Sequence, residues 1–243
     1  MIEIINLHKS FRDKKVLCGI ELTINDSETL AVIGPSGCGK SVLLKNIVRL
    51  LEPDEGKVII DGSDISKLSQ KELYKLRRKF GFLFQGAALF DSMTVEENIS
   101  LPLREHYNSI HISEIRKSVA EKLEMVGLHG IEKLKPSELS GGMKKRVGLA
   151  RALITNPSYI FYDEPTTGLD PIMSDSIDML IKQLNDKLSV TSIVVTHDMF
   201  SVKNVADRIV MLHEGKVYFN GKPDELLNTN DKIVSDFIRR TGF

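Results

Sequence analysis

The chain has 243 residues, enough to bury a substantial core as one large domain or two small ones. Its 33 basic and 33 acidic side chains balance, so bulk charge favours neither nucleic acid nor an anionic membrane as a partner. A composition of 42% hydrophobic and 27% charged residues excludes global disorder, and two cysteines, Cys18 and Cys38, are too few for a disulfide framework or a zinc site.

The amino-terminal sequence MIEIINLHKSF carries Glu3 and has no long apolar stretch, so we expect neither a secretory signal nor a transit peptide. The longest apolar runs, such as Ser192–Val195, have the length of a strand and are far shorter than the roughly 20 residues that cross a bilayer. We therefore expect the chain to stay in the cytosol and to reach a membrane only through partners.

Short apolar runs alternate with helix-periodic segments along the chain. Several runs are apolar without strict alternation, which is typical of strands buried on both faces of a largely parallel sheet, and the order predicts an α/β core with right-handed crossovers. The expected strands are Ile2–Leu7, Val16–Ile24, Thr29–Ile33, Lys57–Ile60, Phe80–Phe84, Tyr159–Tyr162, Ser192–Thr196, Arg208–His213 and Lys216–Asn220. The expected helices are Lys40–Leu51, Lys71–Arg78, Ser113–Met125, Gly141–Thr155, Ile172–Leu188 and Met199–Val205.

Between Gln85 and Pro157 no convincing strand occurs, and the charged, helix-periodic sequence predicts a mostly helical insertion. We therefore expect one domain built from a core, residues 1–84 and 158–222, and a helical subdomain, residues 85–157. Residues 223–243 form a tail, in which Asp231–Phe243 has the pattern of a short basic amphipathic helix with Phe237 and Ile238 on its apolar side.

A phosphate-binding loop follows the expected strand Thr29–Ile33. Its glycines let backbone N–H groups curl around a di- or triphosphate, and the next helix adds its positive N-terminal dipole. Lys40 supplies positive charge to the β- and γ-phosphates, and Ser41 offers a hydroxyl to Mg²⁺. The structural alternative, a glycine-rich turn without a ligand, does not account for the strand before the loop and the helix after it. The loop residues are Gly34, Pro35, Ser36, Gly37, Cys38, Gly39, Lys40 and Ser41.

Two carboxylates, Asp163 and Glu164, end the apolar run Tyr159–Tyr162. A strand can deliver Asp163 to a magnesium ion while Glu164 points towards an attacking water. Alone, the pair also suits a strand that ends in solvated acids. Downstream of a phosphate loop, we expect Glu164 to be the general base that activates or orients water for attack on the γ-phosphorus.

Two further polar residues end apolar strands. His197 follows Ser192–Thr196 and is placed to contact the γ-phosphate, although a strand-end histidine is more often structural. Gln85 follows Phe80–Phe84, where the helical insertion begins, and its amide is placed to touch metal or water. By itself a glutamine at a strand end indicates little.

The segment Leu139–Met143 contains Ser140, Gly141 and Gly142 directly before a helical run. A hydroxyl and two glycines at a helix start form another anion-binding end, or simply a capped start with a flexible turn. One triphosphate needs one cradle. A second cradle in one chain therefore indicates a nucleotide held by another copy.

Together these elements resemble the ABC ATPase superfamily from about residue 1 to residue 221. The resemblance makes Gly34–Ser41 the Walker A loop, Asp163–Glu164 the Walker B pair, Gln85 the Q-loop, Leu139–Met143 the signature and His197 the switch histidine. It also implies that Asp170, in the D-loop with Leu169, takes part in the nucleotide site. Phe11 matches an aromatic that stacks on adenine, although a single Phe after a strand is usually core.

The resemblance implies a P-loop NTPase (RecA-like) core with an antiparallel β subdomain and an inserted helical subdomain. It implies ATP and Mg²⁺ as cofactors, with Ser41, Gln85 and Asp163 at the metal. It also implies a head-to-tail homodimer, in which two ATP molecules lie between one chain's Walker A loop and the other's signature.

A narrower likeness is to the ATPases of Mla/Mce-type bacterial phospholipid transport systems. Met143 stands where most relatives have Gln or Glu, and Gln85–Val95, Pro102–His106 and Pro136–Glu138 are similar too. One departure is Ala87, where that subfamily commonly has Gly, and it concerns coupling more than hydrolysis.

The resemblance thus implies a transport ATPase attached peripherally to the cytoplasmic face of the inner membrane of a Gram-negative-type bacterium. Its implied partners are permease subunits, a small STAS-type regulatory subunit and a periplasmic lipid-binding protein. The alternatives are an ATPase for another cargo, such as amino acids or lipoproteins, and a non-transport ABC ATPase in cluster assembly. Repair and translation relatives carry coiled coils or duplicated cassettes, and this sequence has neither heptads nor duplication.

Overall fold

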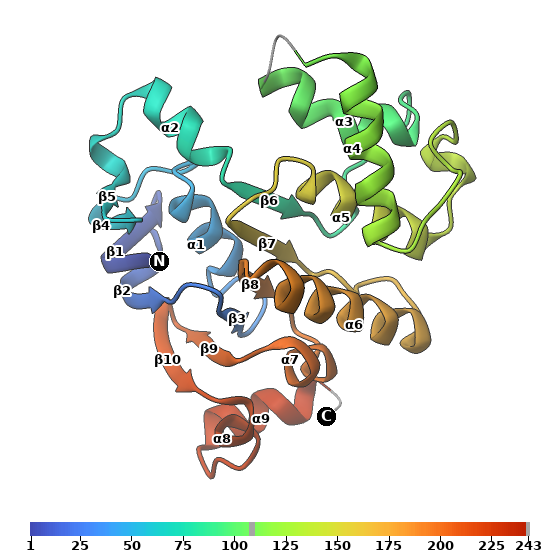
Figure 1. Ribbon diagram of the computed structural model, residues 1–243. Helices are drawn as coiled ribbons and strands as arrows, with labels where there is room; N and C mark the ends of the chain where they lie inside the picture. The colour runs from blue at the N-terminus through green and yellow to red at the C-terminus, as the bar shows by residue number, and fades with distance from the viewer. Residues whose placement is uncertain (107–109, 242–243) are drawn as a thin grey trace. The chain divides into compact units, whose positions relative to one another are not determined.

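The structure, a computed structural model, describes residues 1–106 and 110–241 (Figure 1). By its internal contacts the chain forms two compact units. Unit 1 consists of Met1–Arg77 and the described residues from Val190 onwards, and unit 2 is Arg78–Ser189. Within the described ranges, no helix has both the length and the apolar character that crossing a membrane requires. The domain boundaries expected after residues 84, 157 and 222 stay a prediction.

Unit 1 contains an antiparallel sheet with the strand order β2-β1-β4-β5. Ile4 of β1 pairs with Leu22 of β2 on one side and with Val58 of β4 on the other, and all three side chains are buried. This sheet confirms the expected antiparallel β subdomain. The strands are β1 (Ile2–Phe11), β2 (Lys14–Ile24), β4 (Glu55–Ile60) and β5 (Ser63–Asp64), followed by the helix α2 (Gln70–Arg77).

The second sheet of unit 1 has β3 (Thr29–Ile33) between β8 (Thr191–Val195) and β9 (Arg208–His213), parallel to both. Every residue of β3 and β8 is buried, as expected for strands that are covered on both faces. The strand β10 (Lys216–Gly221) is antiparallel to β9. The helices of this part are α1 (Lys40–Ile47), α7 (Met199–Val205), α8 (Pro223–Leu227) and α9 (Lys232–Arg240).

Helix α9 is anchored to the core of unit 1. Asp231 caps it by accepting hydrogen bonds from the backbone N–H groups of Ile233 and Val234. Phe237 packs into an apolar cluster that includes residues of β3, β9 and α7, and Ile238 packs against that cluster. Phe237 and Ile238 therefore lie on the apolar side of α9, which occupies Lys232–Arg240 of the expected helix Asp231–Phe243, while residues 242–243 lie outside the described part.

The described residues of unit 2 form two parallel strands, β6 (Phe80–Leu83) and β7 (Tyr159–Asp163), and four helices longer than a single turn. Aromatic rings fill the space beside these strands: Phe80 stacks on Tyr159 at 4.8 Å, and Phe82 meets Phe161 edge to face at 5.1 Å. The helices, drawn from green to orange in Figure 1, are α3 (Val95–His106), α4 (Ile112–Met125), α5 (Gly141–Leu153) and α6 (Pro171–Leu188).

Some elements end elsewhere than expected. Helix α1 stops at Ile47, not Leu51, because Arg49 adopts a left-handed conformation with φ of 53° and the helix cannot continue through it. Helix α3 was not among the expected helices. It contains Pro102 in its interior, where a proline normally breaks a helix. The short elements β5 and α8 were also not expected.

Candidate nucleotide-binding and hydrolysis site

The phosphate loop of unit 1 connects β3 to α1. Gly34, Gly37 and Gly39 all have positive φ, and a β-carbon on Gly34 would lie 2.3 Å from the carbonyl oxygen of Leu212. Only glycine fits such a backbone. On Gly37 a β-carbon would meet no atom within 4 Å, so the outer side of the loop is open to a ligand.

Two residues at the end of the loop carry the expected phosphate and metal chemistry. The Lys40 ammonium donates to the carbonyl oxygens of Gly34 at 2.7 Å and Pro35 at 3.2 Å. These hydrogen bonds hold the ammonium at the loop that would bind a phosphate. Ser41 is exposed in the first turn of α1. No side chain caps this helix and no acidic residue lies in its first turn, so its N-terminal dipole stays available to an anion.

Cys38 lies inside the phosphate loop. Burial raises the pKa of its thiol, although the charge of Lys40 opposes the shift. A thiol that stays protonated is a poor nucleophile, so Cys38 contributes backbone and packing, not reactivity.

Phe11 lies at the end of β1, in the hairpin with β2. Its ring is 44% exposed, and the Lys9 ammonium lies 5.7 Å from the ring centroid. The hairpin also approaches the phosphate loop, because a β-carbon on Gly39 would lie 2.8 Å from Leu17 of β2. An exposed ring on this hairpin fits the expected stacking role better than the core position that a single Phe usually takes.

His197 follows β8 and is exposed. Together with Gly34, Pro35 and Ser36 it lines a cavity of about 400 Å³, whose other walls come from β9 and α9. Unit 1 therefore brings the expected switch histidine and the phosphate loop to one cavity. Asp198 accepts hydrogen bonds from the N–H groups of Phe200 and Ser201, so the residue after His197 starts α7.

Asp163 and Glu164 follow the buried part of β7, and both are half-buried. Glu164 has a φ of 50°, a left-handed conformation that costs about 1 kcal/mol for a residue with a side chain. Such strain persists where the surroundings hold it, often at functional sites. The Thr167 hydroxyl donates to the Glu164 carboxylate at 3.2 Å and thereby orients it.

Gln85 is exposed directly beyond β6, and the signature residues open α5. The Ser140 hydroxyl accepts a hydrogen bond from the Met143 N–H at 3.3 Å and so caps α5. A capped helix start was one of the two interpretations of this segment, beside an anion-binding end. Asp170, expected in the nucleotide site, accepts from the Met173 N–H at 3.0 Å and caps α6.

Lysine 145, which the motifs did not single out, joins two of these elements. Its ammonium, on α5, donates to the carbonyl oxygen of Gln85 and, at 3.1 Å, to that of Glu164. Thr167 and Met173 were missed as well. The available signal for Lys145 was a lysine on a helical face otherwise rich in small and apolar residues.

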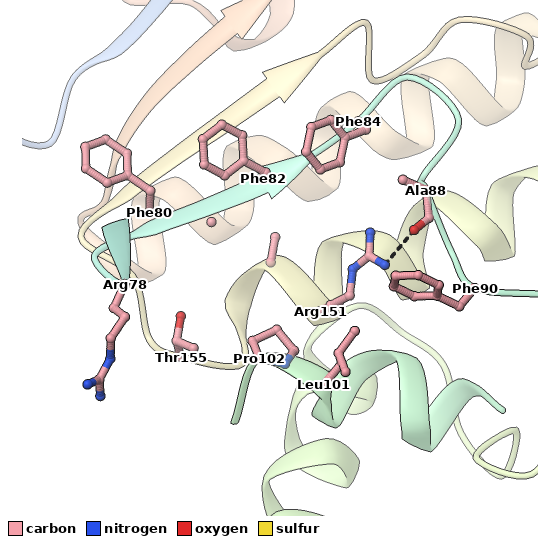
Figure 2. A pocket seen from close by; sticks show the side chains of 12 residues that line it. Arg78, Phe80, Phe82, Phe84, Ala88, Phe90, Leu101, Pro102, Arg151 and Thr155 are labelled. Atoms are coloured by element: carbon pink, nitrogen blue, oxygen red, sulfur yellow. Dashed lines mark hydrogen bonds between the residues drawn. The ribbon is translucent and has the colours of Figure 1, made fainter. Parts of the chain in front are cut away.

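Unit 2 also contains an apolar groove of about 380 Å³ (Figure 2). Phe80 and Phe82 of β6 and Phe84, directly after it, line one side, and Leu101 and Pro102 of α3 line another. Phe90 is half exposed at its edge, close to Arg151 in Figure 2. Phe90 is exposed, while Leu89 and Met93 in the same segment are only partly exposed.

The predicted site residues divide between the units. Unit 1 carries Phe11, His197 and the phosphate loop with Ser41, and unit 2 carries Gln85, Asp163, Glu164 and the signature. Among the described residues no group of three or more His, Cys, Asp or Glu side chains could hold a metal by itself. A hydroxyl, an amide oxygen and one carboxylate (Ser41, Gln85 and Asp163) are a suitable donor set for Mg²⁺, which usually brings water and substrate phosphate as further ligands.

Residues 17–167 match the ABC transporter family, and the chain belongs to that family. It is an ATP-binding and ATP-hydrolysing subunit of an ABC transporter with the P-loop NTPase fold.

Two curated relatives cover nearly the whole chain. The "Probable ribonucleotide transport ATP-binding protein mkl" of Mycobacterium tuberculosis (strain ATCC 25618 / H37Rv) is 44% identical over 243 residues, which are 99% of this chain and 67% of that protein. The "Intermembrane phospholipid transport system ATP-binding protein MlaF" of Haemophilus influenzae is 43% identical over 241 residues, 98% of this chain and 90% of that protein.

Among solved structures, the ATP-binding cassette MJ0796, a dimer in a post-hydrolysis state bound to ADP and Pi, superposes with a TM-score of 0.83. Its sequence is 37% identical, and the match covers 92% of this chain and 99% of that one.

Proposed function

We propose that this chain energises the transport of phospholipid between the membranes of a Gram-negative-type bacterium. The observation that carries the proposal is the sequence at three places: Met143 in the signature and the segments Gln85–Val95 and Pro102–His106. The 43% identity to MlaF, over 90% of that protein, supports it. The mkl relatives are named for a competing cargo, a ribonucleotide.

Within the site, Lys40 and the amides of the phosphate loop bind the phosphates of ATP. Ser41, Asp163 and the Gln85 amide hold Mg²⁺, which neutralises charge on the phosphate oxygens when it is bound. Glu164, oriented by Thr167, positions the attacking water, and His197 contacts the γ-phosphate. Phe11 stacks on the adenine, and Asp170 takes part through the D-loop.

The signature residues Ser140, Gly141 and Gly142 serve the ATP of a second copy, so the active form is a head-to-tail homodimer. The test is an obligate heterodimer with Ser140→Arg in one chain and Lys40→Ala in the other, each of which we expect to be inactive as a homodimer. One composite site then carries both lesions and the other is intact, so activity should return. No ATP binding at the intact site would refute the shared site. Binding without turnover would mean that hydrolysis requires two intact sites.

The groove of unit 2 receives a helix of the membrane permease, and the surface Gly86–Leu103 forms its rim. Exposed aromatic rings beside an apolar hollow are typical of a partner site. The subunit is thus held at the cytoplasmic face of the inner membrane by its permease, with a STAS-type subunit and a periplasmic lipid-binding protein as further partners.

The permease contact is tested with Phe90→Asp, because a carboxylate in an apolar contact must be desolvated. The variant should lose co-purification with the detergent-solubilised permease and keep its affinity for ATP. A matched control is Ile172→Asp, at a residue of α6 that is 81% exposed. Equal retention of the permease by both variants would remove Phe90 from the interface.

The cargo is tested by deleting the gene. If phospholipid is the cargo, the deletion strain should lose its detergent resistance and have an abnormal phospholipid content at the cell surface. Expression of the wild-type chain should restore both properties, whereas expression of Glu164→Gln should not. A deletion strain with a normal surface that fails to take up a ribonucleotide, an amino acid or a lipoprotein precursor assigns the other cargo. A strain that is normal in all of these but defective in cluster assembly assigns the non-transport function.

A further inference from the structure

One face of the signature helix α5 holds the segment that follows β6. Lys145, Gly148 and Arg151 recur at intervals of three residues, so they lie on the same side of the helix. Lys145 donates to the carbonyl oxygen of Gln85, and Arg151 donates to those of Ala87 at 2.6 Å and Ala88 at 2.7 Å. Lys145 and Arg151 therefore bind a single stretch of backbone, Gln85–Ala88.

Gly148 allows the close approach that these hydrogen bonds need. A β-carbon at this position would lie 3.0 Å from Leu83 Cδ1 and 3.1 Å from Ala87 Cβ, tighter than ordinary van der Waals contact. The stretch is also strained, because Ala87 and Ala88 both have positive φ, of 58° and 47°. Left-handed backbone is unfavourable for alanine, and the hydrogen bonds from Arg151 help to hold the stretch in this conformation.

The second hydrogen bond of Lys145 reaches the other side of the site. It goes to the carbonyl oxygen of Glu164, which is itself left-handed, with φ of 50°. Lys145 is only 5% exposed. Burial lowers the pKa of its ammonium, while the carboxylates of Glu164 and Asp163 counter the shift. Burying a charged ammonium costs desolvation free energy unless it is hydrogen-bonded. The two backbone carbonyl groups supply these hydrogen bonds to Lys145.

We propose that Lys145 is a positioning residue for hydrolysis: its ammonium fixes the backbones of Gln85 and Glu164 to the signature helix and thereby sets the aim of the Glu164 carboxylate at the attacking water. The inference rests on the proposed role of Glu164. Lys145 acts through the backbone conformation of Glu164 and not by contact with the nucleotide or the attacking water.

The test uses the full chain in its detergent-solubilised transporter complex. Lys145→Met keeps the length of the side chain and removes its donors, and Lys145→Arg keeps charged donors. Lys144→Met, at the preceding residue of α5, is the matched control. For each variant, kcat, KM and the ATP dissociation constant are measured, with the folded fraction taken from nucleotide-binding stoichiometry.

We expect Lys145→Met to lower kcat by about tenfold to a hundredfold with ATP affinity within about twofold, because the phosphate loop is untouched while the aim of the carboxylate is lost. Lys145→Arg should recover most of the loss, and Lys144→Met should behave as wild type. Adding Lys145→Met to Glu164→Gln should cost little more than Glu164→Gln alone, since both lesions remove one function.

Several results would overturn the proposal. Normal kcat in folded Lys145→Met, a loss shared equally by kcat and ATP affinity, or an additive loss in the double variant would each do so. The failure is distinguishable from failure of the proposed function: normal turnover in Glu164→Gln removes the role of Glu164. Normal turnover in Lys145→Met beside an inactive Glu164→Gln removes only the role of Lys145.

Discussion

The thioether methyl of Met173, on α6, covers Gly142 of the signature so closely that a β-carbon on this glycine would lie 2.0 Å from Met173 Cε. Leu169 covers Gly141 in the same way at 3.4 Å, the edge of ordinary contact. The start of α5 is thus packed against the loop and helix that begin at Asp170. A larger side chain at Gly142 would displace Met173 and so alter the start of α6, because the Met173 N–H also donates to Asp170, the N-cap of α6.

We expect Gly142→Ala to lower ATPase activity about tenfold while changing the free energy of unfolding by less than about 1 kcal/mol. The higher helix propensity of alanine offsets the displacement of a flexible methionine, whereas the shift of Met173 disturbs the signature. ATPase rates and thermal unfolding of Gly142→Ala, Met173→Ala and the double variant provide the check. Adding Met173→Ala should restore activity; a double variant as impaired as Gly142→Ala would show that crowding is not the cause.

Glu164→Gln should reduce turnover at least about a hundredfold and leave ATP binding intact, because it removes the carboxylate charge but not the phosphate loop. The ATP-bound dimer should then accumulate, which size-exclusion chromatography with ATP would detect. The matched control, Glu121→Gln on the exposed side of α4, should keep wild-type rates. Near-normal ATPase activity of Glu164→Gln in the presence of the permease would exclude Glu164 as the general base.

Lys40→Ala should weaken ATP binding by roughly tenfold to a hundredfold, as expected when a buried phosphate loses a charged hydrogen-bond donor. In the structure this ammonium is hydrogen-bonded to the carbonyls of Gly34 and Pro35, so its loss also loosens the loop. Calorimetric titration with ATP measures the effect, with Lys45→Ala, in the last turn of α1, as the control. An unchanged dissociation constant would contradict the assignment of Lys40.

Glu28 and Arg208 tie the start of β9 to the loop before β3. Arg208 donates to both carboxylate oxygens of Glu28, at 2.5 and 2.9 Å, and also to Thr23 and Asn220. Burial alone would raise the pKa of Glu28, but the hydrogen bonds and charge of Arg208, with the amides of Asn25, outweigh it and hold the pKa below its ordinary value of 4.5.

A depressed folded-state pKa means that this pair stabilises the fold fully above the unfolded pKa, and that the contribution is lost as the pH falls through the folded pKa. Glu28→Gln should therefore reduce the free energy of unfolding by about 3 kcal/mol at neutral pH, and by progressively less as the pH falls below 4.5. Urea unfolding at a series of pH values tests this, with exposed Glu124→Gln as the control. A difference between Glu28→Gln and wild type that stays constant from neutral to acid pH would be inconsistent with the ion pair.

The sequence alone was sufficient for the elements whose cause is local. Thr29–Ile33 and Arg208–His213 have the bounds that their apolar runs predict, and the glycines of the phosphate loop lie where the backbone requires positive φ. Helix ends were less predictable. Whether α1 continues past Ile47 depends on the left-handed turn at Arg49, whose guanidinium donates to the carbonyl oxygens of Ile65 and Leu68, and these contacts are not visible in a local pattern.

Only the tertiary structure decided what the buried polar groups do. Helical periodicity places Lys145 and Arg151 on one face of α5, but it cannot say that this face lies against a strained backbone segment. Lys145 meets Gln85 and Glu164, which are 60 and 19 residues away in the chain. Such a contact is set by the packing of α5 beside β6, because a long side chain finds its acceptors only after the helices and strands have docked.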